Sequence, residues 1–314
     1  MHIQWYPGHM TKTRRMMEET ISLVDIVIEL VDARIPYSSK NPDLDDLAKN
    51  KHRIILLNKS DLADPAATEI WTQYFTEKGF RVIQMNALKG SGMAEVTNIA
   101  RDLMKEKIEK LRAKGRINVP IRSMIAGIPN VGKSTFINKY VGKTTAKTGD
   151  KPGVTRGKQW IKLKKDFELL DTPGILWPKF EDQQVGLKLA FTGAINDDIL
   201  DAQTLATAFI NHMMVVNPEC IQKRYQIAFD TIAEPYDVLC QIAEARSFKL
   251  KGGEPDLERA SKILMDEFRG GKLGRITLEL PEDITEMLAE KAEREKEKAQ
   301  SDKARKAEYK KRKS

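Results

Sequence analysis

Short runs of Ile, Val and Leu alternate with longer amphipathic stretches over the first half of the chain. Near-continuous apolar runs are typical of strands buried on both faces, as in a parallel sheet covered by helices. The predicted strands are 25–33, 53–59, 81–87, 117–127 and 159–171, and the predicted helices are 12–23, 65–79, 91–113 and 133–141. This pattern predicts an α/β fold with a mostly parallel sheet and helices on both faces.

The pattern changes after about residue 184. From there to about 266, helical periodicity with loop breaks at Asn217-Pro218 and Gly252-Gly253 predicts an all-helical domain. Residues 287–314 carry few large apolar side chains and 11 Lys or Arg against 6 Asp or Glu, which is typical of a solvated helix or a disordered tail. We therefore divide the chain into an N-terminal segment (1–23), an α/β domain (24–178), a helical domain (179–284) and a basic tail (285–314).

Composition narrows the class of protein. The 314 residues include 53 Lys or Arg and 45 Asp or Glu, so the formal charge of +8 favours polyanionic partners. Two cysteines are too few for a disulfide framework or a four-thiolate zinc site. The first ten residues contain no apolar signal region, and the longest apolar stretch, 205–216, is interrupted by Asn211 and His212. We expect a cytoplasmic protein that does not enter a membrane.

The sequence GIPNVGKS, from Gly127 to Ser134, follows a predicted strand and opens a predicted helix. In that context G-x-x-x-x-G-K-[ST] is a phosphate loop, whose N–H groups cradle phosphate oxygens. Lys133 is expected to bridge the β- and γ-phosphates, and the Ser134 hydroxyl is expected to bind Mg²⁺. The predicted nucleotide-binding residues of this loop are Asn130, Val131, Gly132, Lys133, Ser134 and Thr135.

The sequence NKSD, at 58–61, lies at the end of another predicted strand. The Asp61 carboxylate can accept paired hydrogen bonds from N1–H and the 2-amino group of guanine, which adenine does not offer in that arrangement. Asn58 and the stem of Lys59 are expected to support the base plane. Asn86, Ala87 and Leu88 end the next strand and resemble the backbone-mediated base contact of GTPases.

A third motif, DTPG, begins at Asp171 and also ends a strand. Asp171 is expected to hold Mg²⁺ through a water, and the Gly174 N–H is expected to sense the γ-phosphate. Thr155, in the preceding polar sequence KPGVT, is the candidate second Mg²⁺ ligand. The mobile switch after DTPG continues through 175–179 into the helical domain, so we expect that domain to respond to the bound nucleotide.

The order of these motifs is a circular permutation of the usual one, because NKSD and Asn86–Leu88 precede the phosphate loop instead of following DTPG. Together with the opening WYPGHM, that order resembles the circularly permuted GTPases of the ribosome biogenesis GTPase A (YlqF) family. The resemblance implies GTP hydrolysis during late assembly of the large (50S) ribosomal subunit, activation by the subunit and binding of ribosomal RNA. GTP, GDP and Mg²⁺ are the implied ligands, and a monomer is expected. Sister families carry zinc-binding domains or an N-terminal barrel. This chain has too few cysteines for the zinc-binding domain and too few residues before its first strand for the barrel.

The residue after Gly174 is Ile175, where many GTPases place the glutamine that orients the attacking water. His9 lies just before the strand that normally follows the switch, and neutral imidazole can polarise water. The resemblance also assigns the catalytic role to this histidine. Asn130 resembles the asparagine of cation-dependent GTPases, which makes it a candidate ligand of K⁺.

Basic residues cluster in two segments. Residues 139–165 contain nine Lys or Arg and one acidic residue, and residues 303–313 contain seven against Glu308. Such segments bind phosphate backbones with little sequence readout.

Two functions stay open at this stage: a ribosome-activated GTPase that acts in assembly, and a GTP-gated RNA-binding scaffold in which hydrolysis only resets occupancy. A metabolic NTPase is disfavoured, because no second substrate site is evident.

Overall fold

The computed structural model describes residues 17–117, 119–142, 159–164, 167–171, 183–197 and 200–285. Within the chain, one compact unit runs to Leu278 and a second begins at Glu279. His9, Thr155, Gly174, Ile175 and the basic tail lie outside the described residues.

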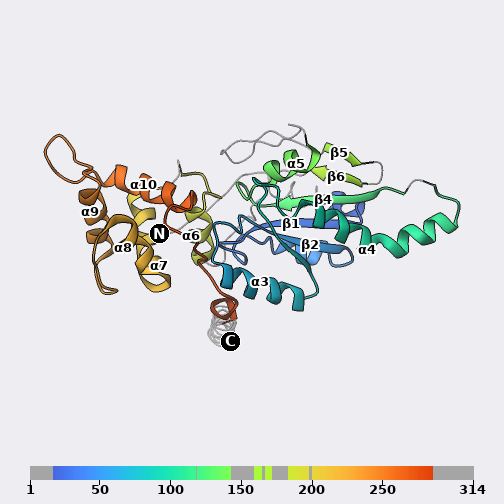
Figure 1. The fold of residues 1–314 in the computed structure, drawn as a ribbon, viewed down its shortest axis with the longest axis horizontal. Coiled ribbons are helices and arrows are strands. Elements are labelled where there is room, and N and C mark those ends of the chain that lie inside the picture. The colour runs from blue at the N-terminus through green and yellow to red at the C-terminus, as the bar shows by residue number, and fades with distance from the viewer. Residues whose placement is uncertain are drawn as a thin grey trace, which may run out of the picture. The chain divides into compact units, whose positions relative to one another are not determined.

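A six-stranded sheet forms the centre of the first unit (Figure 1). Its strands are β1 (Ile26–Asp32), β2 (His52–Asn58), β3 (Arg81–Gln84), β4 (Ile121–Gly127), β5 (Gln159–Lys164) and β6 (Phe167–Asp171). The spatial order is β3-β2-β1-β4-β6-β5, and every pairing is parallel except the antiparallel pair β5–β6. The predicted α/β fold with a mostly parallel sheet is confirmed.

The prediction of one strand over 159–171 was wrong, because this stretch forms two antiparallel strands. The charged residues Lys164, Lys165 and Asp166 separate its two apolar runs. Three consecutive charged residues do not fit a single strand that is buried on both faces, because such strands are near-continuous apolar runs.

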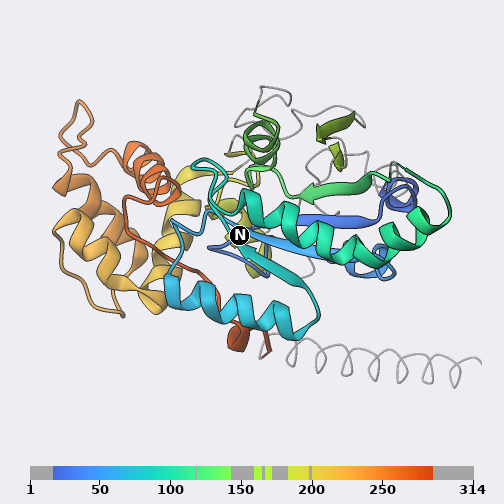
Figure 2. The same ribbon diagram turned by 45° about the vertical axis from the view of Figure 1, so that its right-hand side comes forward.

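Both faces of the sheet are buried, as near-continuous apolar strands require. Four helices follow the first four strands: α2 (Asp43–Leu47), α3 (Pro65–Glu77), α4 (Met93–Ala113) and α5 (Lys133–Val141). Alternate residues of β1 serve different faces: Ile28 shares a buried cluster with residues of α4 and α5, and Val27 shares one with Met17, Ile21 and residues of α2. Figure 2 shows α3 and α4 beside the sheet.

The predicted long helices agree with the structure within a few residues, and residues 17–22 of the predicted first helix are helical. Asp64 caps α3 by accepting a hydrogen bond from the Ala67 N–H at 2.8 Å, and Pro65 occupies the first helical position. The short helix α2 is an addition to the prediction, since five residues are too few to show a period.

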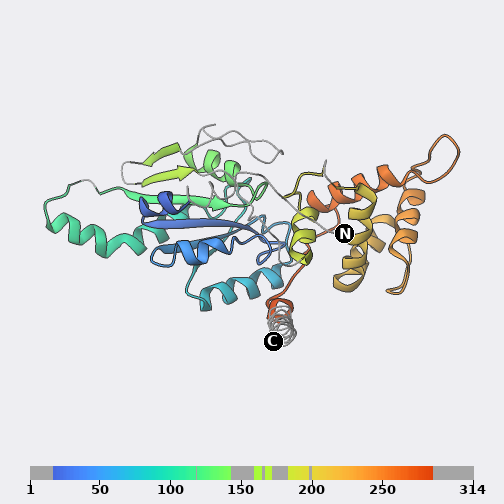
Figure 3. The same ribbon diagram turned by 180° about the vertical axis from the view of Figure 1, so that it is seen from behind.

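After the sheet, the described chain is mainly helical. The helices are α6 (Gln183–Phe191), α7 (Ala202–Val216), α8 (Pro218–Tyr225), α9 (Pro235–Ala245) and α10 (Leu257–Arg269), which we call the helical segment (Figure 3). The rings of Phe191 and Phe268 both pack on Phe209, with centroids 5.3 Å and 4.7 Å from it. No helix among the described residues is long and apolar enough to cross a membrane.

The helical segment and the residues that follow α10 contact the loops at which the parallel strands end. The Ile276 N–H donates to Leu62 O after β2 at 2.9 Å, and Leu278 N–H donates to Arg34 O after β1 at 2.8 Å. After β4, the Asn130 side chain donates to Gly193 O at 2.7 Å. In open α/β sheets, ligands bind outside the carboxyl ends of the strands. The helical segment therefore adjoins the edge at which a ligand site is expected.

Candidate nucleotide-binding site

The phosphate loop connects the end of β4 to the start of α5. Its backbone enters the left-handed region at Asn130 (φ 57°) and Gly132 (φ 99°), and α5 then begins at Lys133. A Cβ on Gly127 would lie 2.9 Å from Val131 Cγ1 and 3.0 Å from Leu30 O, so the close approach to β1 requires glycine. The first N–H groups of a helix have no partner within the helix, and they point towards a ligand at its N-terminus.

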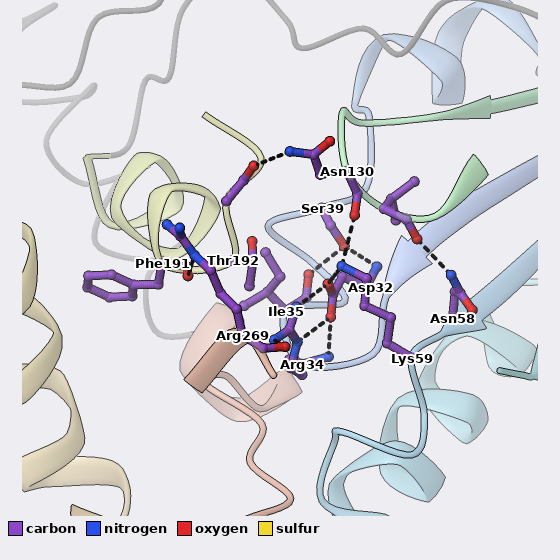
Figure 4. A network of polar contacts seen from close by, with 12 residues as sticks. Asp32, Arg34, Ile35, Ser39, Asn58, Lys59, Asn130, Phe191, Thr192 and Arg269 are labelled. Carbon is purple, nitrogen blue, oxygen red and sulfur yellow. Dashed lines mark hydrogen bonds and ion pairs between the residues drawn. The ribbon is translucent and has the colours of Figure 1, made fainter. Parts of the chain in front are cut away.

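The Asn58 side chain joins three predicted motifs. It is 2% exposed, and its Nδ2 donates to Val131 O of the phosphate loop at 2.7 Å. Its Oδ1 accepts from the N–H of Ala87 at 2.9 Å. Figure 4 shows the contact between Asn58 and the phosphate loop. The NKSD, Asn86–Leu88 and phosphate-loop sequences, which are up to 73 residues apart, thus meet at one buried amide.

Lys59 makes a second connection to the phosphate loop. Its backbone has φ 61°, and its Nζ donates to Asn130 O at 2.8 Å. The same ammonium forms an ion pair with Asp32 Oδ2 at 2.9 Å. Asp61, two residues later, is exposed, which leaves its carboxylate accessible to a ligand.

A family model described as "50S ribosome-binding GTPase" matches residues 122–234. The "Ribosome biogenesis GTPase A" of Bacillus cereus is 50% identical over 290 residues, covering 92% of this chain and 97% of the relative. The chain belongs to the ribosome biogenesis GTPase A family. It is accordingly a GTPase.

More distant relatives and solved structures agree. The protein of the same name from Thermotoga maritima is 32% identical and covers 92% of this chain and 98% of the relative. The GNP-bound YlqF of T. maritima superimposes with a TM-score of 0.59 at 30% identity, covering 86% of this chain and 99% of that one. A GDP-bound YlqF gives a TM-score of 0.60 at 30% identity, with coverage of 85% and 100%.

Hydrogen bonds to neighbouring residues fix the conformation of the loop at 86–88, which the sequence predicts to contact the base. The backbone N–H of Asn86 donates to Ser91 Oγ at 3.0 Å, and the side-chain Oδ1 of Asn86 accepts from the Lys89 N–H at 2.9 Å. The Ala87 N–H donates to Asn58, as described above. These contacts fix the backbone of the loop at Asn86 and Ala87, and Leu88 beside them is exposed.

Of the predicted phosphate and magnesium residues, the described ones follow β4 or end the neighbouring strand β6. Lys133 is 6% exposed, and Ser134 and Thr135 are half-buried in the first turn of α5. Asp171 ends β6 and pairs in register with Ile125 of β4, two residues before the phosphate loop begins.

Sequence reasoning missed Asp32, the last residue of β1, and Arg34, which lies two residues after it. Arg34 donates to Asp32 through Nε at 2.9 Å and through a terminal nitrogen at 2.8 Å, and both side chains are buried. Burial alone would raise the pKa of Asp32, but the charges of Arg34 and Lys59 outweigh it and hold that pKa well below its ordinary value. Burial lowers the pKa of Lys59, against the attraction of Asp32. The signal in the sequence is an Asp and an Arg two residues apart at the end of an apolar run.

Gly132→Ala should disrupt the junction at Asn58. The new Cβ would lie 2.4 Å from Asn58 Nδ2, at a backbone φ that disfavours alanine. The matched control is Gly142→Ala, which has φ 71° and no atom within 4 Å of its Cβ. We expect the control to lose about 1–2 kcal/mol of unfolding free energy from backbone strain alone.

Gly132→Ala should lose more stability than the control, and it should weaken GDP binding at least about tenfold because a buried hydrogen bond is displaced. Denaturant unfolding and equilibrium nucleotide binding measure the two effects. Equal behaviour of the two variants would contradict a role for the Asn58 junction.

Proposed function

We propose that this GTPase acts in the assembly of the large ribosomal subunit, where it binds ribosomal RNA and hydrolyses GTP when activated by the subunit. The names of its relatives and of the matching family support the biological role. The nucleotide chemistry is supported by the two hydrogen bonds of the Asn58 side chain, which connect NKSD to the phosphate loop and to Ala87.

In this proposal the exposed Asp61 reads the guanine, and Asn58 and Lys59 hold its loop against the phosphate loop. The Leu88 N–H supplies the backbone contact to the base. Residues 130–135 and Gly174 bind the phosphates. These assignments use the left-handed loop and the N-terminus of α5 as the anion site.

The oxygen donors present fit a magnesium site. Mg²⁺ is usually bound by one or two carboxylates together with substrate phosphates. Asp171 ends β6, which pairs with β4, and Ser134 lies in the first turn of α5, after the loop that follows β4. Thr155 would complete the protein ligands, and Asn130 is proposed as a K⁺ ligand. When bound, such cations neutralise charge that develops on the transferred phosphoryl group.

The chain order of the sheet fits a circular permutation. NKSD follows β2, the phosphate loop follows β4, and DTPG begins at the end of β6, so the guanine motif precedes both phosphate motifs. The helical domain thereby continues from the switch after DTPG. We propose that the segments 1–23, 24–178, 179–284 and 285–314 act as catalytic segment, GTPase domain, helical RNA-binding domain and basic tail.

The cellular location and the oligomeric state of this GTPase are part of the same proposal. We propose that this GTPase acts on the ribosomal precursor in the cytoplasm and does so as a monomer. Basic segments 139–165 and 303–313 would bind the RNA phosphates.

Asp61→Asn should change the base that is selected. The amide offers a donor to the 2-oxo group of xanthine and cannot accept both guanine hydrogen bonds. We expect GTP affinity to fall by at least about 100-fold, as for loss of a charged hydrogen-bonded pair, and XTP binding to appear. Competition binding with GDP, GTP and XTP measures this, and unchanged GTP affinity would refute the assignment of NKSD.

Purified large subunits should stimulate GTP hydrolysis by this chain. Multiple-turnover assays with and without subunits, at matched GTP saturation, measure the effect. Subunit binding without stimulation would favour the GTP-gated scaffold. Hydrolysis that is independent of subunits, without subunit binding, would favour a metabolic NTPase.

His9→Ala should preserve GTP affinity and subunit binding while lowering subunit-stimulated kcat by about 10²–10⁴-fold, the usual effect of a general base. The described histidines are poorly placed for this role: His52 begins β2, away from the carboxyl edge, and His212 contacts Leu278 O at 3.0 Å. Single-turnover assays on the subunit measure the change. Intact stimulated turnover would place the catalytic group elsewhere.

A further inference from the structure

Lys59 belongs to a group of buried charges, and two members of that group, Asp32 and Arg34, have no part in the contacts proposed above. The Asp32 carboxylate, 2% exposed, lies between the guanidinium of Arg34 and the ammonium of Lys59. The Arg34 side chain is 1% exposed and also stacks over the Phe268 ring at 5.1 Å.

Stability alone is a weak reason for such a group. Desolvation of buried charges consumes most of their attraction, and apolar residues of similar volume often replace a buried ion pair without loss of stability. Removal of one partner is different, because it leaves an uncompensated charge. The arrangement therefore favours a role in fixing the position of Lys59.

The contacts of this group form a closed ring that starts and ends at Asn130 (Figure 4). Asn130 O accepts from Lys59, which pairs with Asp32, which is held by Arg34. Arg34 donates to Arg269 O at 3.4 Å, at the end of α10.

The ring closes through the end of α6. The Arg269 side chain donates to Ala190 O at 2.8 Å and to Phe191 O at 2.9 Å. Gly193 O, two residues beyond Phe191, accepts from the Asn130 side chain at 2.7 Å. The phosphate loop is thus bonded to the helical segment directly by its side chain and indirectly through Lys59.

We propose that Asp32 is a positioning residue for guanine-nucleotide binding, which holds Lys59 against the phosphate loop and, through Arg34, ties that contact to the ends of α6 and α10. The inference rests on the proposed function, in which the NKSD and phosphate loops bind the nucleotide.

The physical reason lies in the charges around Lys59. Arg34 and Arg269 are both cations that act against its protonated form, and Asp32 is the anion that offsets them. The Lys59 side chain is 23% exposed, so it has a route to solvent. Without the Asp32 charge, repulsion from Arg34 should move the ammonium towards water and away from Asn130 O.

The primary test is Asp32→Asn in the full chain, with equilibrium binding of fluorescent GDP. The change preserves side-chain size and removes the charge. We expect the dissociation constants of GDP and GTP to rise by about 10- to 100-fold, as for loss of a hydrogen bond to a charged group. An unchanged dissociation constant would overturn the proposal.

Glu29→Gln is the matched control. Glu29 lies on the same strand, its side chain is 1% exposed, and it pairs with Arg53 at 2.5 Å. It also accepts from the Asn41 N–H at 2.8 Å, and these partners lie outside the three motif loops. We expect Glu29→Gln to lower the melting temperature and to leave GDP affinity unchanged. A loss of affinity that follows stability in both variants would make Asp32 merely structural.

A double-mutant cycle tests whether Asp32 acts through Lys59. In a Lys59→Ala background, Asp32→Asn should weaken GDP binding by less than about threefold, because the positioned group is already absent. Additive losses would overturn the proposal. If Asp32→Asn alone does not fold, Asp32→Asn combined with Arg34→Met removes one charge of each sign and takes its place in the cycle.

Base selection distinguishes a failure of this inference from a failure of the proposed function. Asp32→Asn should not acquire XTP binding, whereas Asp61→Asn should. A wild-type chain that binds no guanine nucleotide would overturn the proposed function and this inference with it. A wild-type chain that binds GDP, with an Asp32→Asn variant of equal affinity, would overturn this inference alone.

Discussion

The carboxamide of Asn58 is 2% exposed, and its buried donor and acceptor groups need hydrogen-bond partners, which two different loops provide. Val131 O accepts from it, and the Ala87 N–H donates to it. The phosphate loop and the loop after β3 are therefore held at fixed positions relative to NKSD. The exposed Asp61 can then be presented at a fixed distance from the anion site at α5.

The edge of the sheet formed by the carboxyl ends of β1, β2 and β4 carries the candidate site and also contacts the helical segment. Strands β1, β2 and β4 are parallel neighbours, so the loops after them emerge side by side. Each of these loops is hydrogen-bonded to a part of the helical segment or to the residues that follow it. The ends of β1, β2 and β4 are therefore connected by hydrogen bonds to the ends of α6 and α10 or to the residues after α10.

The sequence predicted that the motif loops lie at strand ends, and the structure brings NKSD, Asn86–Leu88 and the phosphate loop together. GIPNVGKS and NKSD each place their functional groups within eight residues, on one turn after one strand, so local spacing determines their geometry. Asp32 and Arg34 could not be found in this way. A carboxylate at the end of an apolar run is also how an ordinary strand ends, and its partner Lys59 is 27 residues away.

The sequence by itself determined the strands β1 to β4, the long helices and the identity of the nucleotide motifs, because apolar period and turn chemistry are local properties. Only the tertiary structure decided how 159–171 folds back, since antiparallel pairing of β5 depends on a partner strand. It also decided which charges meet beneath the site. Arg34 and Arg269 are 235 residues apart, and their contact depends on packing of the helical segment against the sheet, which no local pattern records.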